Sequence, residues 1–290
     1  MVSFSLEYFP PQVESEKLDL IAQAESMSMY QPKYMSITHS FNVEGHNNTL
    51  EMAEEITSRI NTPVIPHMTC AKYSKDDILS MAHDYHNLGL ESVVALRGDS
   101  KNHDDLDRYT DAKEFTQALS DQFNFRLLTA GYPEGHPESV SLEKDMGYLK
   151  EKCLIGIDEI ITQWFFSNKD FLMYRDNVSA FGIDTPISAG ILPISDFEKV
   201  KKFAAVCGAN IPQSLQQKYD AISDNDALGI QELGQSIAID QIENLQKEGI
   251  DNFHLYTLNR KGLTQDVIHH FNKPMKPQTK EMLKNNRKAS

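Results

Sequence analysis

Short apolar runs recur along the chain, each five to eight residues long and rich in β-branched and aromatic residues. This length and composition are typical of strands buried in a parallel sheet. The eight runs are VSFSLEYF (2–9), YMSIT (34–38), VIPHMT (64–69), SVVAL (92–96), FRLLTA (125–130), EIITQ (159–163), PISAG (186–190) and NFHLY (252–256).

The stretches between these runs carry apolar residues at helical spacing. Within residues 76–90, Gly89 is placed to end a helix just before the next strand. The apolar face of that helix consists of Ile78, Met81, Ala82, Tyr85 and Leu88. A second stripe, in residues 227–248, consists of Ile230, Leu233, Ile237, Ala238, Ile242 and Leu245. The pattern therefore predicts strands and helices in alternation.

Eight such units within about 250 residues favour a single (β/α)8 TIM barrel over a doubly wound sheet. We predict one barrel domain over residues 1–272 and a flexible basic tail over residues 273–290. The longest gap, between the seventh and eighth strands, is predicted to hold a helix near 197–207, a loop containing Ile211-Pro212 and the helix that begins at 227.

Charge narrows the range of partners. The formal net charge is −14, which disfavours a nucleic-acid partner because phosphate binding needs a basic surface. The tail from Lys273 differs, with six Lys or Arg against one acidic residue, and we interpret it as a solvated extension.

The sequence shows no signal for export or for membrane insertion. We find no charged-then-apolar leader and no apolar run near the roughly 20 residues that cross a bilayer, so we expect a cytoplasmic protein without a membrane partner. Cys70, Cys153 and Cys207 lie far apart without a C-x-x-C pair, which favours reduced thiols over disulfides or a zinc finger.

Polar residues gather where the predicted strands end, which is where barrels of this class carry their chemistry. We expect them to form one ring around one pocket: Glu7, Thr38, His39, His67, Thr69, Arg97, Gly98, Asp99, Tyr132, His136, Gln163, Tyr256 and Arg260. The tripeptide Arg97-Gly98-Asp99 also matches an adhesion signal, but its place after a buried strand favours a ligand-facing strand end.

Several of these residues have alternative interpretations. Glu7, between Leu6 and Tyr8, is either paired with an Arg or a general acid whose pKa is raised by its apolar surroundings. The sequence around His67 has no matching acid or His cluster, so we expect no metal site. The proline-flanked turn at 132–138 is either a site loop or a stiff helix entry.

Two common nucleotide-binding motifs are absent from the sequence. The chain contains neither G-x-G-x-x-G nor a P-loop, so any nucleotide must bind across the barrel top. The residues alone therefore predict a barrel enzyme with an acid, an Arg-Asp pair and aromatic walls.

Eight ordered motifs give a more specific indication: SLEYFPP, KYMSIT, PHMTC, VVALRGD, GYPEGHPES, ITQWFF, GILPISDF and FHLYTLNR. From about Ser3 to about Phe271 the chain resembles the bacterial 5,10-methylenetetrahydrofolate reductase family. The resemblance implies an FAD-dependent oxidoreductase that makes 5-methyltetrahydrofolate with NADH or NADPH, by ping-pong hydride transfer through the flavin. It also implies a homo-oligomer that acts in one-carbon metabolism and methionine biosynthesis.

The resemblance assigns roles to individual residues. Glu7 matches the proton donor to the folate, and Asp99 matches the carboxylate that lies against flavin and pterin. Its FAD and nicotinamide contacts fall on Thr38, His39, His67, Arg97, Gly98, Asp99, Thr110, Tyr132, His136, Asp145 and Lys152. Its substrate contacts fall on Gln163, Lys199, Phe203 and Arg260.

The chain departs from the family pattern at several places. His39-Ser40 stands where the family usually has Tyr-Gly, and residues 46–49 replace an Arg-x-x-Thr. Tyr148 and Glu151 replace an Asn and an Arg beside the FAD-binding lysine, and Lys199 replaces a Gln of some members. Two other readings stay open: a pterin-binding methyltransferase barrel, and a flavin or folate carrier without turnover.

Overall fold

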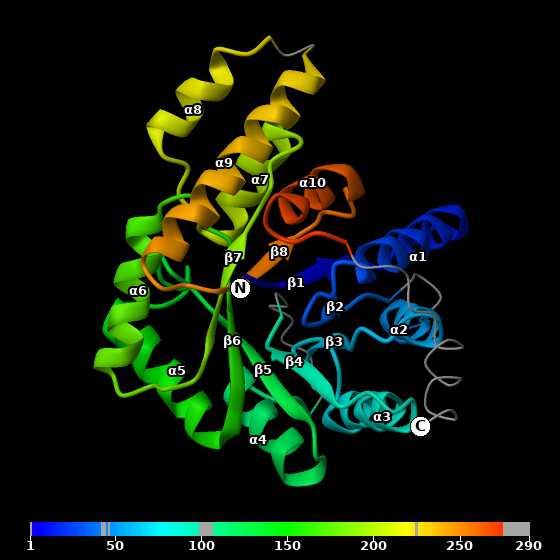
Figure 1. Ribbon diagram of the computed structural model, residues 1–290. Coiled ribbons are helices and arrows are strands. Elements are labelled where there is room, and N and C mark those ends of the chain that lie inside the picture. The colour runs from blue at the N-terminus through cyan, green and yellow to red at the C-terminus, as the bar shows by residue number, and fades with distance from the viewer. Residues whose placement is uncertain (1, 42–44, 46, 99–106, 224–225, 275–290) are drawn as a thin grey trace, which may run out of the picture. The chain divides into compact units, whose positions relative to one another are not determined.

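The computed structural model describes residues 2–41, 45, 47–98, 107–223 and 226–274, and in these residues strands and helices alternate (Figure 1). The eight strands follow one another in chain order as a closed barrel. They are β1 (Ser3–Tyr8), β2 (Met35–Ile37), β3 (Val64–Thr69), β4 (Ser92–Leu96), β5 (Arg126–Gly131), β6 (Ile157–Thr162), β7 (Ile187–Ile191) and β8 (Asn252–Tyr256). The predicted (β/α)8 TIM barrel is confirmed.

The helices occupy the connections between strands. They are α1 (Glu14–Ser28), α2 (Asn48–Arg59), α3 (Lys75–Asn87), α4 (Ala112–Gln122), α5 (Leu142–Gly156), α6 (Asn168–Ala180), α7 (Phe197–Cys207), α8 (Gln213–Asp220), α9 (Ala227–Lys247) and α10 (Lys261–Phe271). Many begin at a side chain that accepts a hydrogen bond from a backbone N–H of the first turn. These caps are Asn47, Ser74, Asp111, Ser141, Ser167, Asp196 and Asp226.

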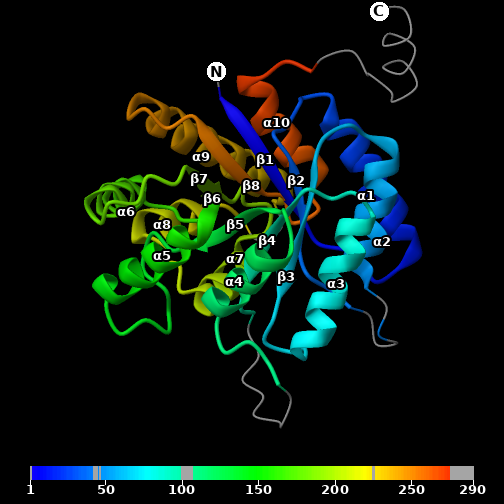
Figure 2. The same ribbon diagram turned by 90° about the horizontal axis from the view of Figure 1, so that it is seen from below.

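The chain divides into two compact units. The first comprises Ser5–Thr129 with Lys273–Ser290, and the second comprises Met1–Phe4 with Ala130–Asn272. In the first unit, parallel pairing runs from β1 through β4, with Leu6 opposite Met35 and Met35 opposite Val64. Helices α1, α2 and α3 lie side by side along these strands (Figure 2).

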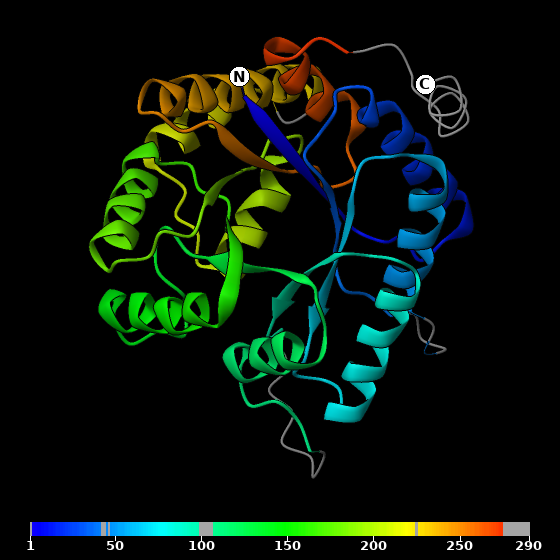
Figure 3. The same cartoon turned by 60° about the horizontal axis from the view of Figure 1, so that its bottom comes forward.

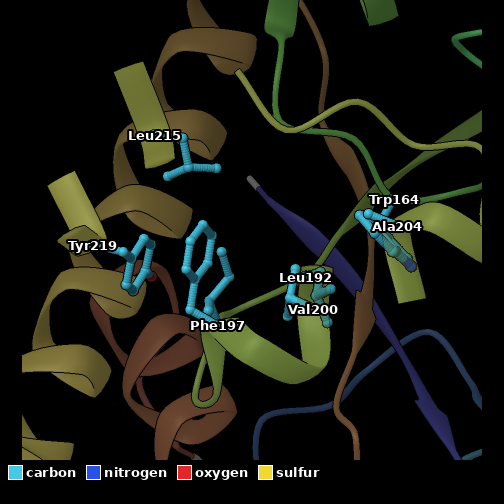
Figure 4. Close-up of a cluster of buried hydrophobic side chains, with 8 residues drawn as sticks. Trp164, Leu192, Phe197, Val200, Ala204, Leu215 and Tyr219 are labelled. Atoms are coloured by element: carbon cyan, nitrogen blue, oxygen red, sulfur yellow. The ribbon is translucent and has the colours of Figure 1, made fainter. Parts of the chain in front are cut away.

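The second unit contains two apolar clusters. In one, Met146 and Leu149 of α5 and Tyr174 and Val178 of α6 pack over Ile160 of β6, and the two green helices lie next to each other in Figure 3. The other cluster joins α7, α8 and the neighbouring loops through Trp164, Leu192, Ile194, Phe197, Val200, Ala204, Leu215 and Tyr219 (Figure 4). Phe197 and Tyr219 stack in it, with ring centroids 4.1 Å apart.

Helix α8 is an element that the hydrophobic pattern did not predict. Its eight residues, QSLQQKYD, include only Leu215 and Tyr219 as buried positions, which is too few to show a helical stripe. The flanking helices α7 and α9 occur where they were predicted. Among the described residues, no helix combines the length and apolar character of a membrane span.

Candidate active site in two groups of residues

The predicted site residues fall into two groups, one in each compact unit. The first group consists of Glu7, Thr38, His39, His67, Arg97, Gly98 and Thr110, and the second of Tyr132, His136, Asp145, Lys152, Gln163, Lys199, Phe203 and Arg260. Asp99 lies outside the described residues. The expectation that all of them surround one pocket stays a prediction.

A buried carboxyl and an imidazole lie together in the first group. Glu7 extends from β1 and His67 from β3, and Glu7 Oε2 is 3.6 Å from His67 Nε2. The side chains are 9% and 10% exposed, respectively. A carboxyl that is shielded from water beside a second titrating group is suited to giving or taking a proton.

His39 links this pair to a cluster of aromatic rings. Its Nδ1 is 3.3 Å from the backbone oxygen of His67, and its Nε2 is 3.1 Å from the hydroxyl of Tyr73. Burial lowers the pKa of His39 to about 4, because it disfavours the charged imidazole. His39 is therefore neutral at pH 7, and Phe41 lies against its ring.

Thr38 is held by backbone contacts just after β2. Its N–H donates to the oxygen of Tyr8, and its own oxygen accepts from the hydroxyl of Thr49. The same Thr49 oxygen accepts from the N–H of Ser40, so the short segment after β2 is fixed from both sides.

The end of β4 requires a glycine. Gly98 has a φ of 86°, and a Cβ at this position would lie 2.9 Å from Cβ of Thr69. Arg97 Nε donates to the oxygen of Gly98. Thr110 lies further along, exposed before α4, where its N–H and hydroxyl both donate to the carboxylate of Glu114.

In the second unit, Asp145 and His136 are joined at the beginning of α5. Asp145 Oδ2 accepts from the N–H of His136 at 3.1 Å, and burial raises the pKa of this carboxyl. The rings of Tyr132 and His136 meet edge to face, with centroids 4.5 Å apart. The turn at 132–138 thus brings these three predicted contacts together, and its role as a site loop stays a prediction.

Lys152 carries a buried positive charge on α5. The residue is 6% exposed, its Nζ donates to the oxygen of Ala130 at 3.5 Å, and the ammonium lies 5.4 Å from the ring centroid of Tyr148. Its neighbour Glu151 is exposed. The positive charge of Lys152 also acts on the nearby Asp145 carboxyl, and a cation at this position is suited to a charge-assisted hydrogen bond with an anion.

Gln163 follows β6 and is fixed through its own backbone. Its N–H donates to the oxygen of Gly131, and its side-chain oxygen accepts from the N–H of Trp164. The hydroxyl of Tyr256, at the end of β8, donates to the oxygen of Thr162. Sequence reasoning placed Tyr256 at a strand end but gave no sign of this contact.

A cavity of about 620 Å³ lies beside Arg260. It is lined by the beginnings of α7, α9 and α10 and by the end of α8. Arg260 is exposed just before α10. Lys199 and Phe203 lie on the exposed face of α7, outside the cavity lining, and Lys199 pairs with Asp196 at 3.6 Å.

Some residues of the site had no sequence signal. Tyr73 lies in a loop after β3 with no motif around it, yet it bonds to His39. Tyr219, which lines the cavity, belongs to the helix that was not predicted. Among the residues that the structure describes, no three or more His, Cys, Asp or Glu side chains are grouped so that they could hold a metal ion.

Comparison with known proteins places the chain among folate enzymes. The family model for methylenetetrahydrofolate reductase matches residues 1–272. The chain is 34% identical over 269 residues to 5,10-methylenetetrahydrofolate reductase of Escherichia coli (strain K12), covering 92% of this chain and 90% of that protein. The enzyme of the same name from Pectobacterium carotovorum subsp. carotovorum is also 34% identical, covering 92% and 89%.

A solved structure of similar fold is that of an uncharacterized protein from Clostridium thermocellum that binds two copies of 5-methyl-5,6,7,8-tetrahydrofolic acid. Its TM-score is 0.66, with 16% identity, and the alignment covers 92% of this chain and 93% of that chain. At this identity the similarity is evidence of the fold alone.

Proposed function

The chain belongs to the methylenetetrahydrofolate reductase family, and on that premise we propose that it reduces 5,10-methylenetetrahydrofolate to 5-methyltetrahydrofolate with FAD and a nicotinamide donor. NADH or NADPH and the folate take turns at the flavin in a ping-pong sequence. FAD would supply the hydride-transfer chemistry that links the nicotinamide to the methylene carbon of the folate.

The observation that carries this proposal is the buried pair of Glu7 and His67. Opening the methylene bridge of the folate needs a proton at a nitrogen, and Glu7 is a carboxyl shielded from water at the end of β1. His67 Nε2 lies 3.6 Å from this carboxyl, near enough for its charge to act on Glu7. Asp99 completes the proposed catalytic residues as an electrostatic influence on the flavin.

The second unit offers groups that fit FAD. The buried ammonium of Lys152 suits the diphosphate, because a cation forms strong charge-assisted hydrogen bonds with phosphate oxygens. Asp145, which accepts the N–H of His136, suits a hydroxyl of the cofactor. In the first unit, Gly98 is proposed as a backbone contact of the cofactor at the end of β4, where its positive φ and the nearby Thr69 require a glycine.

The folate is proposed to meet Gln163, Lys199, Phe203 and Arg260. The guanidinium of Arg260, at the edge of the cavity, suits a carboxylate of the folate tail. Phe203 is 44% exposed on α7 and offers an apolar surface for an aromatic ring. The nicotinamide is proposed to lie near Thr38.

The experiment is identification of the bound cofactor followed by anaerobic half-reactions. Purified protein should release FAD rather than FMN, be bleached by NADH or NADPH, and regain its colour when 5,10-methylenetetrahydrofolate is added, with 5-methyltetrahydrofolate as product. Absence of flavin after reconstitution would favour a pterin-binding methyltransferase. Bound FAD that is never reoxidised by the folate would favour a carrier without turnover.

A further inference from the structure

Three rings gather beside the end of β3, and one of them stands where the chain departs from its family. His39, Phe41 and Tyr73 pack with all three centroid separations at 5.3 Å. Both ring nitrogens of His39 lie within hydrogen-bond distance of a partner. This arrangement fixes the orientation of the imidazole at both ends.

The partners of His39 determine its tautomer. A carbonyl oxygen can only accept, so Nδ1 must carry the hydrogen that goes to the oxygen of His67. Burial first, and then the nearby His67 and Lys72 side chains, lower the pKa of His39 to about 4, so Nε2 is unprotonated at pH 7. Nε2 therefore accepts from the Tyr73 hydroxyl, and the hydrogen bonds run in one direction from Tyr73 through His39 to His67.

The carbonyl that His39 binds lies just beyond the end of a strand pairing. The register of β2 and β3 ends with Ile37 opposite Pro66, and His67 is the next residue of β3. The imidazole of His39 thus continues the attachment between these segments after the regular pairing ends. It fixes the backbone of the residue whose own imidazole lies 3.6 Å from the carboxyl of Glu7.

We propose that His39 is a positioning residue for Glu7 and acts through His67. The proposal rests on the function proposed above, in which Glu7 supplies a proton to the folate. His39 holds the carbonyl of His67, which keeps the His67 imidazole directed at the Glu7 carboxyl. A displacement of about 1 Å in such a constellation can cost about a hundredfold in rate, so a hydrogen bond one residue away is sufficient to matter.

Three variants test this proposal in the half-reactions. His39→Phe keeps a ring but loses both hydrogen bonds, His39→Asn keeps an N–H near the position of Nδ1, and Tyr73→Phe removes only the outer bond. We expect His39→Phe to slow reoxidation of the flavin by the folate at least about tenfold, and by a clearly larger factor than it slows flavin reduction by the nicotinamide. His39→Asn should recover most of the loss, and Tyr73→Phe should lie between parent and His39→Phe.

Equal slowing of both half-reactions, or the same loss in His39→Asn as in His39→Phe, would overturn the proposal and leave His39 as a packing residue. Unchanged rates in all three variants would overturn it as well. If the parent itself shows no reaction with the folate, the proposed function fails instead.

A spectroscopic measurement keeps the inference testable if His39→Phe does not fold. In the purified protein with 15N-labelled histidine, one imidazole should show the neutral Nδ1–H pattern from pH 7 down to about pH 5, because its pKa is about 4. That signal should be absent in His39→Asn and shifted at Nε2 in Tyr73→Phe. A charged imidazole or an Nε2–H tautomer at pH 7 would contradict the direction of the hydrogen bonds.

Discussion

The residues proposed for chemistry and those proposed for holding the folate differ in how firmly the fold fixes them. Glu7 and His67 are each about a tenth exposed, and His39 is bonded through both ring nitrogens. The side chain of Lys199 is 57% exposed, and Arg260 is exposed before α10. The proposed proton donor is thus set in place before the substrate arrives, whereas the residues proposed for folate recognition have room to adjust to it.

This difference has a physical reason. Proton transfer needs a geometry that holds within a few tenths of an ångström, and a buried, bonded group supplies it without reordering. An exposed cation contributes little to binding by itself because water and salt screen it. Changes at Glu7, His67 or His39 should therefore alter a rate, and changes at Lys199 or Arg260 should alter the affinity for the folate.

The largest effect is expected for Glu7→Gln. The amide cannot donate the proton that opens the methylene bridge, so reoxidation of the flavin by the folate should slow about a hundredfold or more. Reduction by the nicotinamide should be unchanged, and stopped-flow absorbance separates the two steps. Glu54→Gln, the same change at an exposed position on α2, is the control. Equal slowing of both steps would make Glu7 structural.

Lys152 is buried like Glu7 but belongs to the other compact unit. It therefore tests whether the size of a mutational effect follows burial rather than the unit in which the residue lies. Lys152→Met keeps the length of the side chain and removes the buried charge, so the apo-protein should remain folded while FAD affinity falls about tenfold to hundredfold, the scale of a charged hydrogen bond. Fluorescence titration of apo-protein with FAD measures it. The exposed Lys144→Met is the control on the same helix. Unchanged affinity would exclude Lys152 from the cofactor site.

A smaller effect is expected at the exposed Arg260. Arg260→Gln removes one screened cation, so KM for the folate should rise a few-fold, about threefold to tenfold, with kcat nearly constant. The rise should shrink at higher salt, since the parent also loses the attraction. Lys218→Gln, an exposed cation on α8, controls for general charge. A fall in kcat with unchanged KM would place Arg260 among the groups that act on the reacting atoms.

The sequence predicted most of the fold because its signals were local. Each strand was a short apolar run, and α3 and α9 showed a stripe of buried residues at helical spacing. Helix α8 escaped prediction because only two of its eight residues are buried. Its place is set by packing with α7, where Phe197 stacks on Tyr219.

The site was predicted unevenly for a similar reason. Ordered motifs identified Glu7 and His67 as candidates. Their contact joins β1 to β3, however, and the spacing of residues along the chain does not reveal it. The same holds for Tyr73, which lies 34 positions from His39. Such contacts depend on how the strands are arranged in three dimensions, which a linear pattern of residues does not specify.

The smallest effect is expected for Glu151→Arg. This variant is compared directly with Lys152→Met, because the two residues are neighbours on α5. Glu151 replaces an Arg of the family pattern beside the FAD-binding lysine, so the sequence alone left open a repulsion between its carboxylate and the diphosphate. In the structure Glu151 is exposed while Lys152, the next residue along α5, is buried. An exposed charge facing solvent contributes little to binding of an anion by its neighbour, because water screens it. We therefore expect parent and Glu151→Arg to bind FAD with dissociation constants within about twofold, measured in the same titration as Lys152→Met. An affinity at least about tenfold tighter in Glu151→Arg would show instead that the arginine side chain reaches the diphosphate from the helix surface and that exposure alone does not separate the two groups.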